Sequence, residues 1–256
     1  MIIGQELIYS NKYSPLERIY IRLFGVPING LRIRARRILP YINKKYNRVL
    51  DAGCGPGIFS FEIARKLPQA TITGIDIDSG LIIENRYISE KLRNKNCVFE
   101  QKDILTMDYF NQFDLAISID NLEHIENDDL ALKNIFAALC PGGDFILHVP
   151  GLYRRWLFFK LKMNFHVNGH YRPGYIKEDI VTKVENAGFK INEVFYTYGW
   201  LETITNNISY LITGAEMRNK ILYAIVFPFL NFVSYFGKGS KPKVGAGILL
   251  VATKQK

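Results

Sequence analysis

Cysteine and long apolar runs are scarce in this chain of 256 residues. Its three cysteines, Cys54, Cys97 and Cys140, show neither C-x-x-C nor Cys/His spacing, so neither a disulfide framework nor a zinc site is indicated. The most apolar stretch, residues 221–236, has 16 residues and contains Pro228, whereas a bilayer span needs roughly 20 apolar residues. The N-terminus lacks the basic segment and apolar run of a secretion signal. We therefore expect a cytoplasmic protein without a membrane-spanning helix.

The net charge of +9 is distributed unevenly along the chain. Residues 1–48 carry 10 basic and 2 acidic side chains, residues 49–150 carry 8 and 16, and residues 151–256 carry 15 and 6. An acidic middle segment between two basic flanks indicates a central unit whose role differs from that of the flanks. The alternative is that the charges are scattered over solvated surfaces.

Strand and helix patterns alternate through the acidic segment. Apolar runs predict strands at residues 47–52, 71–77, 97–100, 113–119 and 144–149. Helical spacing predicts helices at residues 58–67, at 79–93 with Ser79 as N-cap, and at 128–139, where a Pro-Gly-Gly sequence at 141–143 breaks the pattern. This alternation is typical of a mostly parallel sheet covered by helices on both faces.

The basic flanks show a different pattern. Residues 15–25 and 30–46 predict two helices, the second rich in arginine. Residues 177–187 predict a further helix and residues 190–196 a strand. Residues 200–236 predict an apolar, mostly helical insertion before a final strand at 247–253.

The strongest motif is V-L-D-A-G-C-G-P-G at residues 49–57. A strand delivers Asp51 to the carboxyl edge of the sheet, and Gly53, Gly55 and Gly57 keep the following turn free of Cβ atoms, so that a ligand can lie against backbone N–H groups. A dinucleotide fingerprint G-x-G-x-x-G is the competing interpretation, but its third glycine would fall on Ile58. The spacing therefore disfavours NAD.

Three acidic residues indicate the charge of the ligand. Asp51 inside the turn would repel a pyrophosphate but suits an ammonium group. Asp76, at the end of the second predicted strand, can accept hydrogen bonds from both hydroxyls of a ribose, and Asp103 follows the third strand at the same edge. The pattern predicts a pocket for a cationic nucleoside.

On these residues the sequence resembles the class I S-adenosylmethionine-dependent methyltransferases, in particular their small-molecule, type 11-like group. The matching motifs are V-L-D-A-G-C-G-P-G, G-I-D-I-D at 74–78, Q-K-D-I-L at 101–105, F-D-L-A-I-S-I-D-N-L-E-H-I at 113–125 and L-C-P-G-G-D-F-I-L-H-V-P at 139–150. The resemblance implies an α/β fold with a Rossmann-like, seven-stranded, mostly parallel sheet, helices on both faces and an antiparallel last strand. N-terminal helices and a helical insertion before the last strand complete the expected fold.

The resemblance also implies which residues hold S-adenosylmethionine, whose product is S-adenosylhomocysteine. The methionine moiety is assigned to the glycine turn, the ribose to the end of the second strand, the adenine to the residues after the third strand, and the surroundings of the sulfonium to the end of the fourth. In that order the residues are Asp51, Ala52, Gly53, Cys54, Gly55 and Gly57; Asp76 and Ile77; Asp103 and Ile104; Ile119 and Asp120.

The same resemblance suggests a division of the chain. Residues 1–46 form an N-terminal helical cap, residues 47–150 the S-adenosylmethionine-binding core, and residues 151–256 the substrate-side insertions with the last two strands of the same sheet. We expect these three parts to make a single domain. Methyl transfer then is an in-line displacement, for which the protein mainly positions the acceptor and excludes water.

Two histidines are the candidate catalytic residues. His124, in D-N-L-E-H, is placed to act as a general base, and His170, in G-H-Y-R-P-G-Y, lies in a loop that in the family approaches the active site. Ubiquinone-biosynthesis O-methyltransferases and small-RNA terminal methyltransferases bind a divalent metal with E-x-x-E-H at the position of Asp120-x-x-Glu123-His124. Because the first acid here is aspartate, we assign no metal; a purely structural role of Glu123 and His124 remains the alternative. His148, on a predicted buried strand, is interpreted as a core histidine.

The flanks suggest the acceptor, since in the family they select the substrate. Aromatic and basic residues interleave at 153–162, and lysines follow the apolar stretch 221–236. Apolar surface beside basic residues suits an anionic membrane. We therefore predict O-methylation of a small, hydrophobic or lipid-linked acceptor by a peripheral enzyme at the inner membrane surface. The alternatives are a cap over the pocket, a homodimer interface, a non-catalytic scaffold or, less favoured because no RNA module is recognisable, an RNA methyltransferase.

Overall fold

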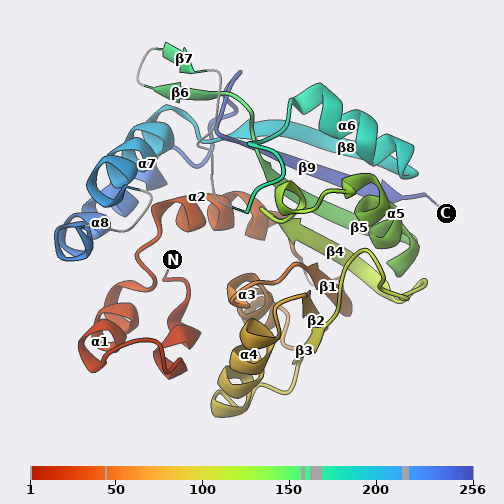
Figure 1. Ribbon diagram of the computed structural model, residues 1–256, viewed down its shortest axis with the longest axis horizontal. Coiled ribbons are helices and arrows are strands. Elements are labelled where there is room, and N and C mark those ends of the chain that lie inside the picture. Colours follow the sequence, from red (N-terminus) through yellow and green to blue (C-terminus); the bar gives the residue numbers. More distant parts are fainter. Residues whose placement is uncertain (1, 44, 157–158, 162–168, 215–218, 256) are drawn as a thin grey trace.

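A seven-stranded sheet forms the centre of the protein. The computed structural model describes residues 2–43, 45–156, 159–161, 169–214 and 219–255. The strand order is β3-β2-β1-β4-β5-β9-β8 (Figure 1). The strands are β1 (Arg48–Ala52), β2 (Thr71–Asp76), β3 (Cys97–Gln101), β4 (Phe113–Ile119), β5 (Leu139–Pro150), β8 (Phe189–Thr197) and β9 (Gly247–Lys254). The pairs among β1 to β5 are parallel, and β9 is antiparallel to both β5 and β8. The predicted fold class is confirmed, including the antiparallel last strand.

Helices cover both faces of the sheet (Figure 1). On one face, α5 and α6 share an apolar cluster with the sheet that includes Leu132, Ile135 and Ile180. On the other, α2, α3 and α4 contribute Ile38, Phe61 and other residues to a second cluster. The helices are η1 (Gln5–Tyr9), α1 (Pro15–Phe24), α2 (Asn29–Ile38), η2 (Leu39–Tyr41), α3 (Ile58–Lys66), α4 (Ser79–Lys91), η3 (Leu122–His124), α5 (Asp128–Ala138), α6 (Lys177–Asn186), α7 (Trp200–Thr213) and α8 (Lys220–Tyr235).

The strand order determines where a ligand can bind. β1 lies between β2 and β4. After β1 the chain forms β2 and β3 on one side of it, and then returns to form β4 on its other side. In open parallel sheets, ligands bind outside the carboxyl ends of the strands at such a switch point. The turn after β1 and the loop after β4 therefore border the expected cleft.

Three predicted element boundaries are wrong. The second helix, predicted at 30–46, ends at Ile38 and continues as the short η2, in which Pro40 cannot donate a backbone hydrogen bond. Asp78, not Ser79, caps α4, because its Oδ1 accepts from Gly80 N at 2.7 Å. β5 begins at Leu139 rather than at 144, and a register shift opposite β4 absorbs the Pro-Gly-Gly sequence as a bulge.

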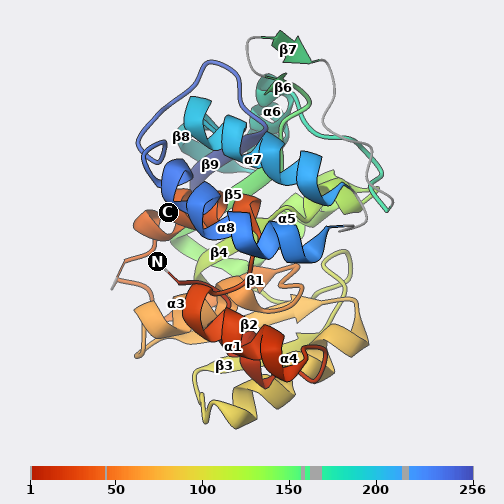
Figure 2. The ribbon, with the colours of Figure 1, turned by 90° about the vertical axis from the view of Figure 1, so that its left-hand side faces the viewer.

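Polar contacts join the N-terminal helices to the helical insertion between β8 and β9. Arg37 of α2 forms a buried ion pair with Glu202 of α7. Pro228 inside α8 has no N–H to bond the carbonyl of Ala224 one turn earlier, and the Tyr20 hydroxyl of α1 donates to that oxygen at 2.7 Å instead. Figure 2 shows α1, α7 and α8 on one side of the molecule. Sequence-distant helices thus form one layer over the carboxyl edge of the sheet.

Two further expectations concern the described residues only in part. The stretch after β5 forms a hairpin of β6 (Arg154–Trp156) and β7 (Phe159–Leu161), but its interleaved aromatic and basic side chains lie outside the described residues. Across the part of the chain that the structure describes, no helix is long and apolar enough to cross a bilayer. The three cysteines are free thiols.

Candidate active site

The turn after β1 exposes backbone at the carboxyl edge of the sheet. Gly53, Gly55 and Gly57 all have positive φ, of 82°, 52° and 73°, which only glycine adopts without strain. A Cβ on Gly53 would lie 2.2 Å from Cγ of Asn121, whereas one on Gly55 would meet nothing within 4 Å. The turn therefore packs tightly against the loop after β4 on one side and faces open space at Gly55, where a ligand can approach the backbone.

Asp51 carries a buried carboxyl at this edge. Its side chain is 2% exposed and accepts a hydrogen bond of 2.6 Å from Ser60 Oγ. No lysine or arginine of the described chain pairs with it. Burial raises the pKa of Asp51 to about 7. A ligand that brings a positive charge to this carboxyl would stabilise its ionised form.

The other two predicted acids lie on the same edge. Asp76 ends β2; its Oδ2 accepts from Gly55 N at 2.9 Å and its Oδ1 from Asp78 N at 3.0 Å. Asp103 follows β3 and accepts from Leu105 N at 2.8 Å. Among their neighbours, Ala52, Cys54 and Ile104 are buried, and Ile77 is 68% exposed. Because β1, β2 and β3 are adjacent and parallel, the three carboxylates follow one another along this edge.

Asp120, in the loop after β4, is held by an ion pair and by a contact with a histidine. Asp120 has a φ of 48°, and its Oδ1 bonds His148 Nδ1 at 2.6 Å while its Oδ2 pairs with Arg34 at 3.0 Å. Burial opposes ionisation, but Arg34 and His148 overcome it and lower the pKa of Asp120 to about 2. His148 is 1% exposed and also contacts Thr197 Oγ1 at 3.0 Å, which agrees with its interpretation as a core histidine.

A cavity of about 270 Å³ lies beside this loop. Arg34 of α2 reaches it from the N-terminal helices, and among the described residues it pairs with no carboxylate other than Asp120. Its Nη1 also donates to the Tyr198 hydroxyl at 3.1 Å. Asn206 and Tyr210 of α7 also line it. The lining residues are Arg34, Asp120, Glu123, His124, His148, Pro150, His170, Pro173, Tyr198, Asn206, Tyr210 and Ala246.

Both predicted catalytic histidines line this cavity. The rings of His124 and His170 meet edge to face, with centroids 4.3 Å apart. His124 Nδ1 lies 3.1 Å from the carbonyl oxygen of Gly169. Because a carbonyl can only accept, Nδ1 carries the proton in a neutral ring, and Nε2 keeps a lone pair for a substrate proton.

Glu123 adds a buried carboxyl to the same group. It is 1% exposed, and its Oε2 accepts no hydrogen bond from the described residues. Burial, reinforced by the negative charge of Asp120, raises the pKa of Glu123 well above its usual range. An uncompensated carboxyl oxygen at the wall of a cavity is costly unless a ligand bonds it.

Asp120, Glu123 and His124, which correspond to the metal motif of the related methyltransferases, do not form one set of ligands in the structure. Asp120 is held by Arg34 and His148, so it does not fit as a ligand without breaking both contacts. The ligand atoms that lie within 4.8 Å of one another belong to Glu123, His124 and His170 instead. One carboxylate and two imidazoles form a donor set that Zn²⁺ or Fe²⁺ accepts. The assignment of no metal stays a prediction.

Sequence reasoning missed Arg34, Tyr198, Asn206 and Tyr210. One signal was present: in the arginine-rich helix α2, Arg34 is two residues from Arg32 and from Arg36, which places it on the opposite face. The other three lie 48 to 60 residues beyond the last family motif, which ends at residue 150, and no local pattern connects them with the sheet edge.

Comparison with known proteins identifies the family of this chain. The sequence model of a family described as "Methyltransferase domain" matches residues 43–193. A ubiquinone biosynthesis O-methyltransferase of Coxiella burnetii is 32% identical over 112 residues, which are 43% of this chain and 47% of that protein. An uncharacterized methyltransferase of Mycobacterium tuberculosis is 33% identical over 96 residues, which are 37% of this chain and 46% of that protein. The matches thus span about half the length of these relatives.

Solved structures share the fold at low sequence identity. Phosphoethanolamine N-methyltransferase 2 of Haemonchus contortus, in complex with S-adenosyl-L-methionine, has a TM-score of 0.62 at 18% identity, covering 100% of this chain and 61% of that one. The [4+2]-cyclase SpnF has a TM-score of 0.58 at 19% identity, covering 87% and 80%. The cyclase illustrates that the fold alone does not specify the reaction.

Proposed function

This chain belongs to the class I S-adenosylmethionine-dependent methyltransferases, and we propose that it methylates a hydroxyl oxygen of a small, hydrophobic or lipid-linked acceptor. The family membership rests on the match to residues 43–193. The observation that supports oxygen as the acceptor is the group formed by Glu123, His124 and His170 at the wall of the cavity. This group offers a proton acceptor in the loop that follows β4.

The residues of the sheet edge fit the cofactor. Asp51, buried and without a cation among the described residues, would take the ammonium group, and the open side of Gly55 leaves room for the methionine chain. Asp76 with Ile77 would hold the ribose, and Asp103 with Ile104 the adenine. When bound, S-adenosylmethionine supplies an electrophilic methyl group on a positively charged sulfur.

His124 is proposed as the general base. A hydroxyl must lose its proton as its oxygen gains the methyl group, and Nε2 of His124 can accept that proton while Gly169 holds Nδ1. A phenol, with a pKa of about 10, gives up its proton far more easily than an aliphatic alcohol. We therefore favour a phenolic hydroxyl, with His170 and the free Oε2 of Glu123 orienting it.

The acceptor class rests on two further supports. The Coxiella burnetii relative is named for O-methylation in ubiquinone biosynthesis, which favours an oxygen acceptor here. Exposed apolar side chains on α7 and α8, among them Leu211 and Phe229, favour a substrate that is dissolved in or attached to an anionic membrane. A homodimer interface or a cap over the pocket would use the same surface.

The test is to identify the methylated atom. The protein is incubated with S-adenosylmethionine carrying a ¹³C methyl group and with four long-chain alkyl benzenes in detergent micelles, bearing a hydroxyl, an amine, a carboxylate or a thiol. We expect a ¹³C signal of an aryl methyl ether from the phenol alone. Product formed from the amine or thiol in place of the phenol would reject oxygen as the acceptor.

A further inference from the structure

Helix α8 carries two apolar stripes, and one of them is exposed. Tyr223, Phe227 and Leu230 recur every three to four residues and are at most 3% exposed, so this stripe packs inside the protein. A second stripe follows the same spacing on another side of the helix. Its members are Ile221 at 80% exposure, Ile225 at 72%, Phe229 at 66%, Phe232 at 61% and, just beyond the helix, Phe236 at 64%. A helix that needs to bury only one face does not require the second stripe.

Helix α1 extends this exposed surface. Leu16, Ile19 and Leu23 recur at helical spacing and are 77%, 58% and 60% exposed. The bond from the Tyr20 hydroxyl to Ala224 O places α1 directly against α8, and Figure 2 shows both helices on the same side of the molecule. We call this surface, made by the exposed apolar residues of α1 and α8 with Phe236, the α1–α8 face. Contiguous exposed apolar surface of this kind marks an interaction site.

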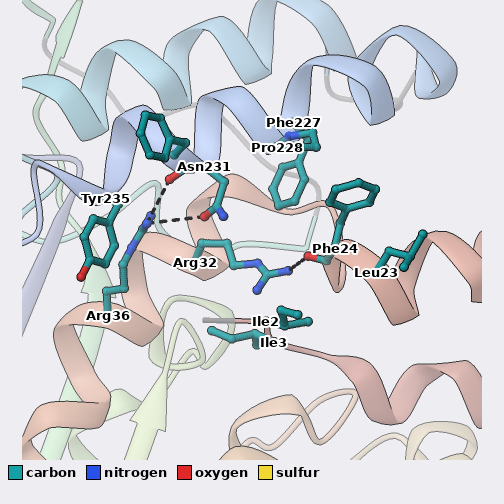
Figure 3. A pocket seen from close by; sticks show the side chains of 11 residues that line it. Ile2, Ile3, Leu23, Phe24, Arg32, Arg36, Phe227, Pro228, Asn231 and Tyr235 are labelled. Carbon is teal, nitrogen blue, oxygen red and sulfur yellow. Dashed lines mark hydrogen bonds between the residues drawn. The ribbon is translucent and has the colours of Figure 1, made fainter.

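A groove of about 330 Å³ runs between the two helices with arginine at its base (Figure 3). Its walls include Leu23, Phe24 and Phe232, and Arg32 and Arg36 of α2 line it. Arg36 donates to neutral oxygens, those of Asn231 and Ser234. Since no carboxylate of the described residues pairs with Arg36, its positive charge is not neutralised within the groove.

The charge around the α1–α8 face has one sign. Residues 12–25 and 219–243 together contain seven basic side chains and one acidic side chain, Glu17. Ion pairs with Glu84 and Glu193 involve two of the seven, Lys12 and Lys241. In a two-fold dimer this surface would meet its own copy, and like charges would repel. An anionic surface complements both the apolar stripe and the charge.

We propose that the α1–α8 face docks on an anionic phospholipid bilayer, with the exposed stripes of both helices entering the headgroup region. This docking specifies how the enzyme of the proposed function would contact the membrane. It rests on the proposed function in one respect, the lipid-linked nature of the acceptor. Helix α7 links the two sites, because Asn206 and Tyr210 line the acceptor cavity while the Ser209 hydroxyl meets Tyr223 of α8 at 3.4 Å. Docking therefore places the acceptor cavity one helix away from the lipid.

Vesicle cosedimentation tests this without any methyl transfer. The full-length protein is mixed with vesicles of phosphatidylcholine alone or with phosphatidylglycerol, at low and high salt. We expect binding to the anionic vesicles that decreases with salt. Phe229→Glu and Ile225→Glu should each weaken it by about tenfold or more, since each removes one inserted apolar side chain and adds a repelled charge.

Matched controls separate docking from folding. Phe110→Glu and Ile83→Glu change side chains that are 70% and 66% exposed but lie outside the α1–α8 face, and they should leave vesicle binding unchanged. S-adenosylhomocysteine binding in all four variants reports that the core is folded. Absent binding to anionic vesicles overturns the inference, as does a wild-type dimer that Ile225→Glu dissociates. Neither result changes what the micelle assay reports, because that assay identifies the methylated atom without vesicles.

Discussion

The proposed cofactor side and the proposed acceptor side of the active site are assembled from different kinds of chain segment. On the cofactor side, Asp51, Asp76 and Asp103 lie at the carboxyl ends of three adjacent strands. Asp76 accepts from the backbone of the turn after β1, and Asp103 accepts from the backbone of its own loop. On the acceptor side, Arg34 and Tyr198 come from positions 164 residues apart and bond side chain to side chain. The first side can form from one contiguous part of the sequence, whereas the second exists only once the helical layer has packed.

This difference predicts that the two sides can be damaged separately. The largest separable effect is expected for His124→Gln, which removes the proposed base. We expect kcat with a phenolic acceptor to fall by roughly 10²–10⁴-fold, the usual contribution of general base catalysis. Isothermal titration with S-adenosylhomocysteine should give the wild-type affinity.

Glu126→Gln, at an exposed position of the same loop, is the control and should retain wild-type kcat. If His124→Gln lowers the affinity for S-adenosylhomocysteine by the same factor as kcat, the two sides of the site are not independent. Unchanged kcat would leave His124 a structural residue.

Asp76→Ala should give the converse result. Loss of charge-assisted hydrogen bonds to the ribose should weaken S-adenosylhomocysteine binding by about 1.5–3 kcal/mol. The acceptor KM, measured at saturating S-adenosylmethionine, should not change. Asp108→Ala removes another carboxylate that follows β3 but is 84% exposed, and it should leave the affinity unaltered. Equal effects of both substitutions would mean that the ribose lies elsewhere.

The same difference explains how much the sequence could predict. The glycine turn, its acids and all seven strands of the sheet follow from local periodicity and motif spacing, and the fold class is confirmed. The position of Arg34 at the acceptor cavity depends on the direction in which α2 crosses the sheet edge, which no local pattern encodes. Glu123 was identified as part of a metal motif, but its uncompensated Oε2 is a property of the packed loop.

Ends of elements were predicted least well, for the same reason. Both Asp78 and Ser79 are good N-cap residues, and the choice depends on which backbone geometry the end of β2 imposes. The Pro-Gly-Gly sequence has the composition of a turn, yet Leu139 pairs with Phe113 of β4, and β5 therefore extends through it as a bulge. Tertiary pairing overrides local preference in such cases.

The buried carboxyl of Asp51 should make cofactor binding dependent on pH. The pKa of Asp51 is raised to about 7 by burial, so below that pH the free protein holds a proton that an ammonium ligand must displace. Affinity for S-adenosylhomocysteine should therefore increase as pH rises through 7 and be about tenfold weaker at pH 6 than at pH 8. Titrations in buffers of different ionisation enthalpy should show proton release at pH 6.

Asp51→Asn provides the comparison for this series, because it cannot titrate. Its affinity should be lower than that of the wild type at pH 8 and should vary less with pH. A wild-type affinity independent of pH would mean that the ammonium group does not reach Asp51. Ser60→Ala, which removes the donor to Asp51, should move the pH midpoint upwards.

The smallest expected effect concerns a single hydroxyl on the acceptor side. Tyr198→Phe deletes the oxygen that bonds Arg34, while Asp120 continues to hold the guanidinium at 3.0 Å. We expect an increase in acceptor KM equivalent to about 0.5–1.5 kcal/mol, the usual value of one hydrogen bond, with unchanged affinity for S-adenosylhomocysteine. Tyr41→Phe also deletes one hydroxyl, which bonds Glu193 at 2.6 Å outside the cavity, and it should alter stability without altering KM. If Tyr198→Phe instead changes cofactor affinity, the loss of this hydroxyl acts through Arg34 and Asp120 on the end of β4, where we propose that the sulfonium lies. The acceptor side would then control the cofactor side.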